Sequence, residues 1–533
     1  MNIQFFSLFS AIKQHSLPES YLAKALKNDK HYITYVNCGG ILKNFCTAMS
    51  GCGLDIDSIQ SSKRRICQKC NNFSNIINKE ISSNVLYLSE YMTETYINEI
   101  NTIMANITKD NCIEFQYLGV EVGRLASYEP VLHHKKMTLD FDAEDWIEYR
   151  INFQNCLIAL RSYEQLFTKN KPDLVIIYSP QYGVNGVVSK FIQNHNIRVY
   201  FIEGGSSNSE RYKSLRIWDF KKFGLVNPAL SYWKEKKDTV KEEDVKRIRG
   251  HISELLAAKS HAVYSEAPSN SFDIFNYFKI KNHQKIILAS LSSFDEAYAA
   301  YVIKKFPENK VKSNVYINQF EWIKDTIKYL SNYPDIFLII RVHPRDYSNK
   351  RDNKRSEQSY IWEEILQDLP SNIVVNYPYE KISIYDLFKD INVLLTGWSA
   401  TGIEAMFYGI PVVTYDKNLP SYPNDIHFSG SNRKEYFNNI QKALKNGRNE
   451  KIITNAYKWS AFNFSLGVFR TPKLFFGDKK NIYEKIILKI LNILIPNLLF
   501  KYEVKKEIKN KKDLDKLLHL VNTQEDSLYQ QLN

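Results

Sequence analysis

Residues Asn392 to Tyr415 read NVLLTGWSATGIEAMFYGIPVVTY and give the clearest indication of the fold. This stretch predicts a buried strand at residues 392–396, a turn of small residues at 397–402, a short helix at 403–407 and a second buried strand at 411–415. Short apolar runs on either side of a helix are typical of a parallel sheet that is covered on both faces. The turn places backbone N–H groups at the start of the helix, which favours binding of an anion such as a phosphate.

Two hydroxyl side chains and a carboxylate accompany this turn. Ser399 and Thr401 lie where they could hold phosphate oxygens, and Glu404 falls in the first turn of the expected helix. A carboxylate there is within reach of a sugar hydroxyl beside a bound phosphate, although a residue that only favours the helix dipole would look the same. The stretch therefore predicts a site for a nucleotide and, through Glu404, for an activated sugar.

Length and composition favour a globular protein of more than one domain. The chain has 533 residues, of which 44% are hydrophobic and 24% are charged, and a single core rarely extends over so long a chain. The formal net charge of +13 fits an anionic substrate, an anionic membrane surface or a nucleic acid. The sequence shows no RNA-binding aromatic signature, zinc-finger spacing or basic recognition helix, so we expect no nucleic-acid partner.

Strands and helices alternate along both halves of the chain. We expect strands at residues 3–9, 31–36, 174–178, 198–202, 286–291, 336–342 and 373–376. This alternation is typical of doubly wound α/β domains. We therefore expect an α/β protein with two Rossmann-like domains that face each other across a cleft. We expect the N-terminal domain at residues 1–275, including a charged helical connector, and the C-terminal, nucleotide-donor domain at 276–460. A basic helical tail is expected at 461–533.

Polar side chains follow several of these strands, at the edge where such sheets bind their ligands. Ser292 and Ser293 follow one expected strand, His343 follows another, and Glu203 follows a strand of the first half. We expect these loops to converge with Ser399 at a single ligand site.

Four short motifs resemble those of a known group of enzymes. They are residues 341–345 (RVHPR), 381–387 (KISIYDL), 398–405 (WSATGIEA) and 409–412 (GIPV). Together they resemble bacterial glycosyltransferases of the GT-B fold, most of all the group that makes capsule and other surface polysaccharides. The resemblance implies transfer of a sugar from a nucleotide-activated donor, such as a CMP-linked acidic sugar, to a growing or lipid-linked surface polysaccharide. It implies no required cofactor.

The resemblance also implies roles for individual residues. His343 and Pro344 would contact the nucleotide phosphate, with the proline fixing the loop. Arg341 or Arg345 would stabilise the leaving phosphate. A buried histidine that bonds only to a backbone carbonyl is the competing interpretation of His343. The expected nucleotide-donor-binding set is Arg341, His343, Pro344, Arg345, Ser399, Thr401, Glu404, Ser292 and Ser293.

Several residues compete for the role of catalytic base, which an inverting transfer requires and a retaining one does not. Glu203 precedes two glycines, in a pattern that resembles the base motif of some sialic acid transferases. His15 follows the first expected strand, and Asp295 and Glu296 follow Ser293. A solvated loop residue is the competing interpretation of each. On the acceptor side the sequence nominates Tyr182 and Asn185.

Two further patterns could indicate a metal. Asp140 and Asp142 form a DxD pattern, but they open an expected helix, so capping explains them better. Cys67 and Cys70 have the spacing of zinc ligands, whereas the other pair, Cys38 and Cys46, is spaced too widely for a standard knuckle. A structural zinc at Cys38, Cys46, Cys67 and Cys70 and a group of buried thiols both stay open.

The two ends of the chain indicate where in the cell the protein is expected. The first twenty residues lack the basic region and cleavage site of a signal peptide, and no transmembrane run is evident, so we expect a cytoplasmic protein. The apolar stretch 482–500 precedes a lysine-rich stretch. It could pack on the first domain, or contact the cytoplasmic face of an anionic inner membrane as a peripheral element.

Other functions remain open at this stage. A CDP-alditol glycerophosphotransferase of the teichoic-acid type uses a similar Arg-x-His-Pro-like motif and a hydroxyl-rich turn. A sugar-nucleotide epimerase shares the GT-B architecture but would need more carboxylates in the cleft. A membrane adaptor would explain the basic tail and not the polar loops at the strand ends.

Overall fold

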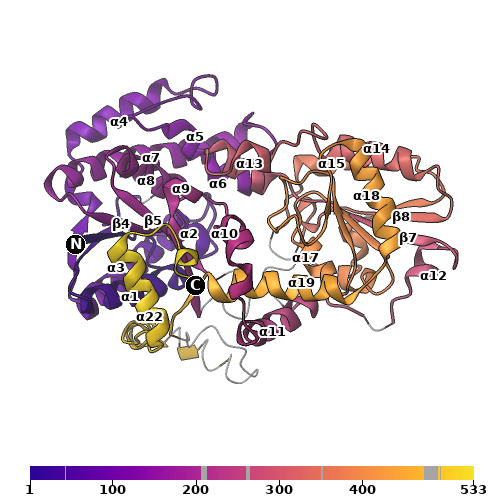
Figure 1. The fold of residues 1–533 in the computed structure, drawn as a ribbon. Helices are drawn as coiled ribbons and strands as arrows, with labels where there is room; N and C mark the ends of the chain where they lie inside the picture. Colours follow the sequence, from indigo (N-terminus) through magenta and orange to yellow (C-terminus); the bar gives the residue numbers. More distant parts are fainter. Residues whose placement is uncertain are drawn as a thin grey trace. The chain divides into compact units, whose positions relative to one another are not determined.

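The computed structural model describes residues 1–42, 44–205, 213–259, 264–269, 271–349, 352–472, 486, 490–491 and 494–532, and Figure 1 shows their elements. The chain forms two compact units. Unit 1 comprises Met1–Pro130, Leu139–Leu225 and Gly467–Leu532, and unit 2 comprises Val131–Thr138 and Val226–Leu466. The main change of unit therefore falls after Leu225 and not near residue 275, and the C-terminal tail belongs to unit 1.

The sheet of unit 1 has seven strands in the described residues, in the order β13-β6-β5-β4-β1-β2-β3. Their bounds are β1 Asn2–Phe6, β2 Tyr32–Asn37, β3 Asn84–Tyr87, β4 Leu174–Tyr178, β5 Arg198–Gly204, β6 Ser214–Asp219 and β13 Phe469–Arg470. The first five strands run parallel, and β6 and β13 are antiparallel additions at one edge. The parallel part is the Rossmann-like sheet that the alternating pattern predicts.

One face of this sheet is covered by helices from both ends of the chain. The helices of unit 1 are α1 Lys13–Asn28, α2 Thr47–Gly51, α3 Gln60–Ile81, α4 Glu94–Asn106, α5 Val122–Ala126, α7 Ala143–Lys169, α8 Gly183–Asn194, α9 Phe220–Phe223, α21 Pro496–Val504 and α22 Lys511–Thr523, while α6 Tyr128–His133 bridges the boundary. Side chains of α1, α3, α21 and α22 share one buried cluster with the strands. The rings of Phe73 and Phe500 stack with their centroids 3.9 Å apart. The described end of the tail thus packs on unit 1.

About half of the apolar stretch 482–500 lies outside the described residues. Among its described apolar side chains, Phe500 is buried and Leu491 and Leu499 are partly buried, whereas those of Ile486, Ile490, Leu494, Ile495 and Leu498 are exposed. Within the described part of the chain, no helix combines the length and the apolar character needed to span a bilayer. Membrane contact by the lysine-rich segment stays a prediction.

Unit 2 is built on a wholly parallel sheet of six described strands, in the order β12-β11-β10-β7-β8-β9. Their bounds are β7 Lys285–Ser290, β8 Ile336–Arg341, β9 Ile373–Asn376, β10 Val393–Thr396, β11 Val412–Thr414 and β12 Phe428–Ser429. Both faces are buried: Ile287 and Ala289 join the cluster on one side, and the alternating Ile286 and Leu288 are buried on the other. The two-domain α/β prediction is confirmed in that each unit carries a Rossmann-like sheet.

The helices of unit 2 connect these strands. They are α10 Ala229–Lys236, α11 Glu242–Leu256, α12 Ile274–Phe278, α13 Asp295–Val302, α14 Gln319–Leu330, α15 Glu357–Ile365, α16 Ile384–Leu387, α17 Thr401–Met406, α18 Arg433–Asn446 and α19 Glu450–Ala461. Large side chains of α14, α15 and α18, among them Trp322, Trp362 and Tyr436, fill one face of the sheet. The charged connector that the sequence predicts is therefore α10 and α11, and both belong to unit 2.

Two helix starts illustrate how local sequence sets the fold. The first helix begins at Lys13 and contains Pro18. Ile12 provides the extended residue before the helix, and its carbonyl accepts from the N–H of Ser16. The capping interpretation of Asp142 is confirmed, because its carboxylate accepts from the N–H groups of Glu144 and Asp145 at the start of α7.

Candidate functional site

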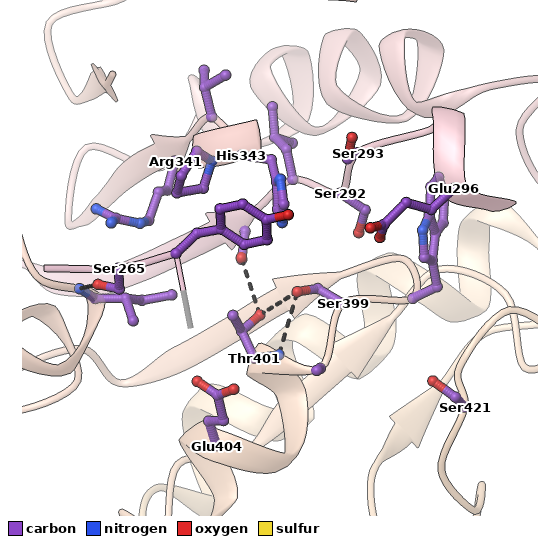
Figure 2. Close-up of a pocket in the computed structure, with 18 residues that line it drawn as sticks. Ser265, Ser292, Ser293, Glu296, Arg341, His343, Ser399, Thr401, Glu404 and Ser421 are labelled. Atoms are coloured by element: carbon purple, nitrogen blue, oxygen red, sulfur yellow. Dashed lines mark hydrogen bonds between the residues drawn. The ribbon is translucent and has the colours of Figure 1, made fainter. Parts of the chain in front are cut away.

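Unit 2 contains a cavity of about 340 Å³ at the carboxyl ends of β7, β8 and β10. Figure 2 shows that its polar side chains come from all three strand ends and from α17. Residues from the expected donor set that line it are Arg341, His343, Pro344, Ser399, Thr401, Glu404, Ser292 and Ser293. This is the convergence that the sequence predicts for the second half of the chain. Arg345 is the one member of that set that does not line the cavity.

His343 lies in the wall as a neutral hydrogen-bond donor. Its Nδ1 accepts from the backbone N–H of Arg345 at 3.2 Å. Burial, with the charges of Arg345, Arg341 and Lys135, lowers the pKa of His343 to about 3. A neutral imidazole whose Nδ1 accepts must carry its proton on Nε2. The ring therefore offers its Nε2–H group to a ligand and stays uncharged at neutral pH.

Hydroxyl groups gather beside the start of α17 (Figure 2). Thr401 Oγ1 lies 2.9 Å from Ser399 Oγ and 3.1 Å from Ser290 Oγ, and the backbone N–H of Thr401 donates to Ser399 Oγ at 3.3 Å. Ser292 Oγ is buried in the same wall and has no hydrogen-bond partner among the described residues. A buried hydroxyl without a partner is costly, and a polar ligand in the cavity would supply one.

The backbone of Ser292 is held firmly from behind. Its N–H donates to Gln319 Oε1 at 2.8 Å, and its carbonyl accepts from the side-chain amides of Gln319 and Gln358 at 2.8 and 3.0 Å. Gln358 also donates to Asp346, a buried carboxylate whose pKa burial raises to about 7. These glutamines are outside the sequence motifs, but they fix the hydroxyl that faces the cavity.

Glu404, from α17, is one of two carboxylates that line the cavity, the other being Glu296. The hydroxyl of Tyr385 donates to Glu404 Oε2 at 3.0 Å. Burial raises the pKa of Glu404 to about 7, against the opposing effect of that bond. A carboxyl group that is half protonated near neutral pH can either accept from a sugar hydroxyl or donate to it. Tyr385 belongs to the KISIYDL motif, but the sequence offers no reason to assign it a role of its own.

Gly402 is required by close packing beneath the turn. A Cβ atom at this position would lie 2.0 Å from the hydroxyl oxygen of Tyr422. Tyr422 is itself buried, so its ring has little room to retreat. The small residue therefore sets the position of the turn that carries Ser399 and Thr401.

The two arginines of the RVHPR motif have different positions. Arg341 lines the cavity, and its guanidinium donates to Asn376 and to the carbonyl of Ile382. Burial lowers the pKa of Arg341 to about 10, so it stays charged at neutral pH. Arg345 instead pairs with Asp295, with 2.7 Å between Nη2 and Oδ2. The expected alternative base Asp295 is thus a partner of Arg345, while Glu296 lines the cavity.

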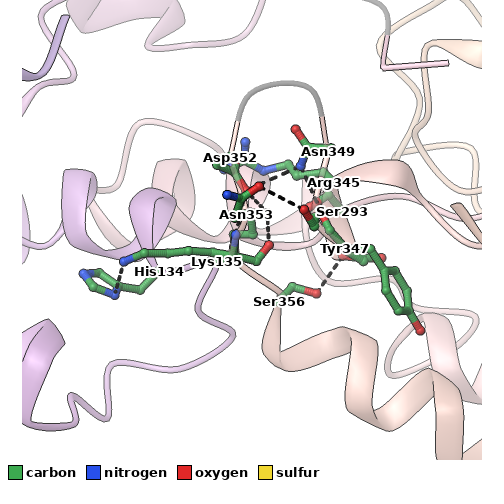
Figure 3. A network of polar contacts seen from close by, with 12 residues as sticks. His134, Lys135, Ser293, Arg345, Tyr347, Asn349, Asp352, Asn353 and Ser356 are labelled. Carbon is green, nitrogen blue, oxygen red and sulfur yellow. Dashed lines mark hydrogen bonds and ion pairs between the residues drawn. The ribbon is translucent and has the colours of Figure 1, made fainter. Parts of the chain in front are cut away.

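A segment from the first half of the chain completes unit 2. Lys135 Nζ donates to Asp352 and to the carbonyl of Lys354, both at 2.6 Å, and Lys354 Nζ lies 3.2 Å from His134 Nδ1. Figure 3 shows this network beside Arg345 and Ser293. Lys136 pairs with Glu357 at 2.7 Å. Residues 131–138 therefore hold the loop that follows the His-Pro pair.

Other residues that line the cavity were not predicted. Sequence reasoning missed Tyr264, Ser265, Ser290, Trp398 and Ser421, all of which line it. Ser290 ends β7, so the rule that ligands bind beyond strand ends could have found it. Tyr264 and Ser265 come from a polar stretch without periodicity, which gives no such signal.

The predicted catalytic and acceptor-side residues lie in unit 1. Glu203 is inside β5 rather than after it, and it pairs with Arg216 of β6 at 3.2 Å with its side chain 38% exposed. His15 lies in α1, where its ring stacks on Tyr178 at 4.1 Å and faces Tyr182 at 6.5 Å. Asn185 is buried and donates to the carbonyl of Tyr178 at 3.0 Å, which is a structural role in the turn before α8.

Glu19 is a buried acid one turn from His15 that the sequence patterns did not nominate. It is 2% exposed, accepts from the Ser7 hydroxyl, and has its pKa raised by burial to about 8. Because its pKa is higher in the folded state, the stability it contributes is present at low pH and is lost as pH rises through about 8.

We predict that Glu19→Gln reduces the loss of stability at high pH. The free energy of unfolding of the wild-type protein should fall by about 2 kcal/mol more than that of the variant between pH 6 and pH 8.5. Urea unfolding of both proteins at the two pH values measures this difference. Parallel pH dependence of the two proteins would contradict the burial of an ionisable Glu19.

The sequence matches no protein-family model and no curated protein. Among solved structures, the chain is similar to a Thermosulfurimonas dismutans KpsC, a beta Kdo 2,7 transferase, with 16% identity over 62% of this chain and 89% of that one, at a TM-score of 0.32. It is also similar to a Methanocaldococcus jannaschii UDP-GlcNAc 2-epimerase, with 12% identity over 86% and 97% of the two chains, at a TM-score of 0.29. Overlaps this loose do not transfer an activity to this chain.

Proposed function

We propose that the cavity of unit 2 binds the nucleotide part of an activated sugar, and that the protein is a glycosyltransferase. The observation that carries the proposal is the set of polar groups that line this cavity. A neutral histidine N–H, a charged arginine, a partnerless buried hydroxyl and a carboxylate meet beyond the ends of three parallel strands. Such strand ends are where parallel α/β sheets bind nucleotides, and the mixture suits a phosphate beside a ribose.

In this proposal different cavity residues bind the phosphate and the ribose of the donor. His343 and the hydroxyls of Ser292, Ser399 and Thr401 bind phosphate oxygens, and Arg341 supplies positive charge nearby. Glu404 hydrogen-bonds the ribose. All of these groups are uncharged donors or fixed cations at neutral pH apart from Glu404, so they stabilise the negative charge that builds on the departing phosphate.

The transfer itself needs an acceptor hydroxyl. Its oxygen forms a bond to the anomeric carbon of the sugar, the bond between that carbon and the phosphate oxygen breaks, and the nucleotide leaves with the electron pair. The acceptor proton passes to a base if the enzyme inverts, for which we propose Glu203 or His15. A growing or lipid-linked surface glycan on the cytoplasmic side of a membrane is the proposed acceptor.

Isothermal calorimetry with nucleotides tests the donor half of the proposal. CMP, CDP, UDP, CMP-linked acidic sugars, UDP-sugars and CDP-glycerol are titrated separately into the full-length protein. We expect one nucleotide class to bind with one site per chain, and the Ser399→Ala, Thr401→Val double variant to bind it at least tenfold more weakly because hydrogen bonds to charged phosphate are lost.

The matched control for this double variant is Ser331→Ala, which removes an exposed hydroxyl at the end of α14. It should bind like the wild type. Selective binding of CDP-glycerol would replace the glycosyltransferase with a glycerophosphotransferase, and conversion of a UDP-sugar without an acceptor would indicate an epimerase. Absence of binding by every nucleotide would overturn the proposal.

A further inference from the structure

Four cysteines from three segments of unit 1 meet at one small cavity. Cys38 follows β2, Cys46 immediately precedes α2, and Cys67 and Cys70 lie one turn apart on the same face of α3. The cavity measures about 20 Å³, which is room for one water molecule or ion. The seven cysteines of the chain are all free thiols in the structure, so no disulfide explains this arrangement.

The backbone brings the cysteine segments together and donates to one of the four sulfur atoms. The turn after Cys38, with both glycines at positive φ, and the extended residue Cys46 before α2 both line the cavity. Cys70 Sγ accepts from the N–H of Ala11 at 3.2 Å. Thiols that only fill space need no such donors, whereas metal-bound thiolates do.

Two lysines lie near this group of partly buried thiols. A bound metal cation would favour the ionised form of the thiols. Phe73 lies one turn after Cys70 on α3. The Nζ atoms of Lys13 and Lys69 lie over its ring, 5.5 and 5.7 Å from the ring centroid. They offer compensation for the net negative charge of a four-thiolate site.

We propose that Cys38, Cys46, Cys67 and Cys70 bind a thiophilic metal centre. No three of these described sulfurs lie within 4.8 Å of one another, whereas a tetrahedral zinc ion with bonds of about 2.3 Å holds its sulfurs roughly 3.8 Å apart. Binding of one zinc ion thus draws the four side chains inward, and an iron–sulfur cluster would hold them further apart. The small cavity favours zinc. The centre fastens residues 38–46 to α3.

Metal analysis of the protein as purified tests this proposal. We expect about one zinc per chain, or iron with acid-labile sulfide and visible absorbance if the centre is a cluster; either result supports four-thiolate ligation. The Cys67→Ser, Cys70→Ser double variant should lose the metal. Cys52→Ser is the matched control, because Cys52 belongs to the same segment but does not line the cavity, and it should keep the full metal content.

Thiol titration of the wild-type protein keeps the test valid if the double variant fails to fold. In the native protein a mercurial reagent should release the metal in step with the modification of four thiols, and denaturation without reductant should expose all seven. Metal-free protein with seven reactive thiols, or with fewer thiols because of disulfides, would overturn the proposal. Equal metal loss in Cys52→Ser and in the double variant would overturn it as well.

Discussion

Replacing His343 with alanine is expected to weaken nucleotide binding roughly 10- to 100-fold, because a hydrogen bond to a charged phosphate is worth about 1.5–3 kcal/mol. The imidazole is neutral, with Nδ1 engaged by the N–H of Arg345, so its Nε2–H is the group that the ligand loses. Calorimetry on the variant, with the nucleotide that the wild type selects, measures the change.

Two amide variants separate the two ring nitrogens of His343. A glutamine amide can reach the position of Nε2, and an asparagine amide can reach only that of Nδ1. We therefore expect His343→Gln to bind the nucleotide more tightly than His343→Asn. If the asparagine variant bound as well as the wild type, the histidine would serve the loop and not the ligand, which is the competing interpretation from the sequence.

Arg345→Met is expected to lower the free energy of unfolding by about 3–5 kcal/mol, because breaking a buried ion pair leaves an uncompensated charge. Asp295 is only 2% exposed and accepts from both Nε and Nη2 of Arg345, at 2.9 and 2.7 Å. The guanidinium also donates to the carbonyl of Leu132 at 2.9 Å, which joins residues 131–138 to the loop. Urea unfolding measures the loss.

A double variant identifies the cause of that loss. Arg345→Met combined with Asp295→Leu removes both charges, so it should recover much of the stability that the single variant loses. Nucleotide affinity of the folded single variant should change much less than that of His343→Ala. A stable Arg345→Met protein that cannot bind nucleotide would instead make Arg345 a phosphate ligand, the role that the motif resemblance implies.

The strands and helices of unit 2 could be predicted well because their patterns are local. The strand Ile373–Asn376 coincides with its predicted range, since it is an apolar run bounded by clear stop signals. The hydroxyl turn was found for the same reason: its small residues stand between two apolar runs. The convergence of Ser292, His343 and Ser399 then follows from the geometry of a parallel sheet.

Features that depend on distant partners could not be read from the sequence. Arg341 and Arg345 look equivalent in the motif, and only Asp295, on another helix, decides which of them lines the cavity. Glu203 was expected in a loop, but pairing with Arg216 of the antiparallel strand β6 extends β5 past it. The same limit applies to the cysteines, whose convergence depends on how α3 packs beside the end of β2.

The most direct measurement is a crystal structure of the protein with the nucleotide that calorimetry selects. The proposed function predicts phosphate oxygens within hydrogen-bond distance of His343 Nε2 and the hydroxyls of Ser292, Ser399 and Thr401, with the ribose beside Glu404. The contacts to the base would name the donor class. A nucleotide bound elsewhere, with this cavity filled only by water, would contradict the assignment of the site.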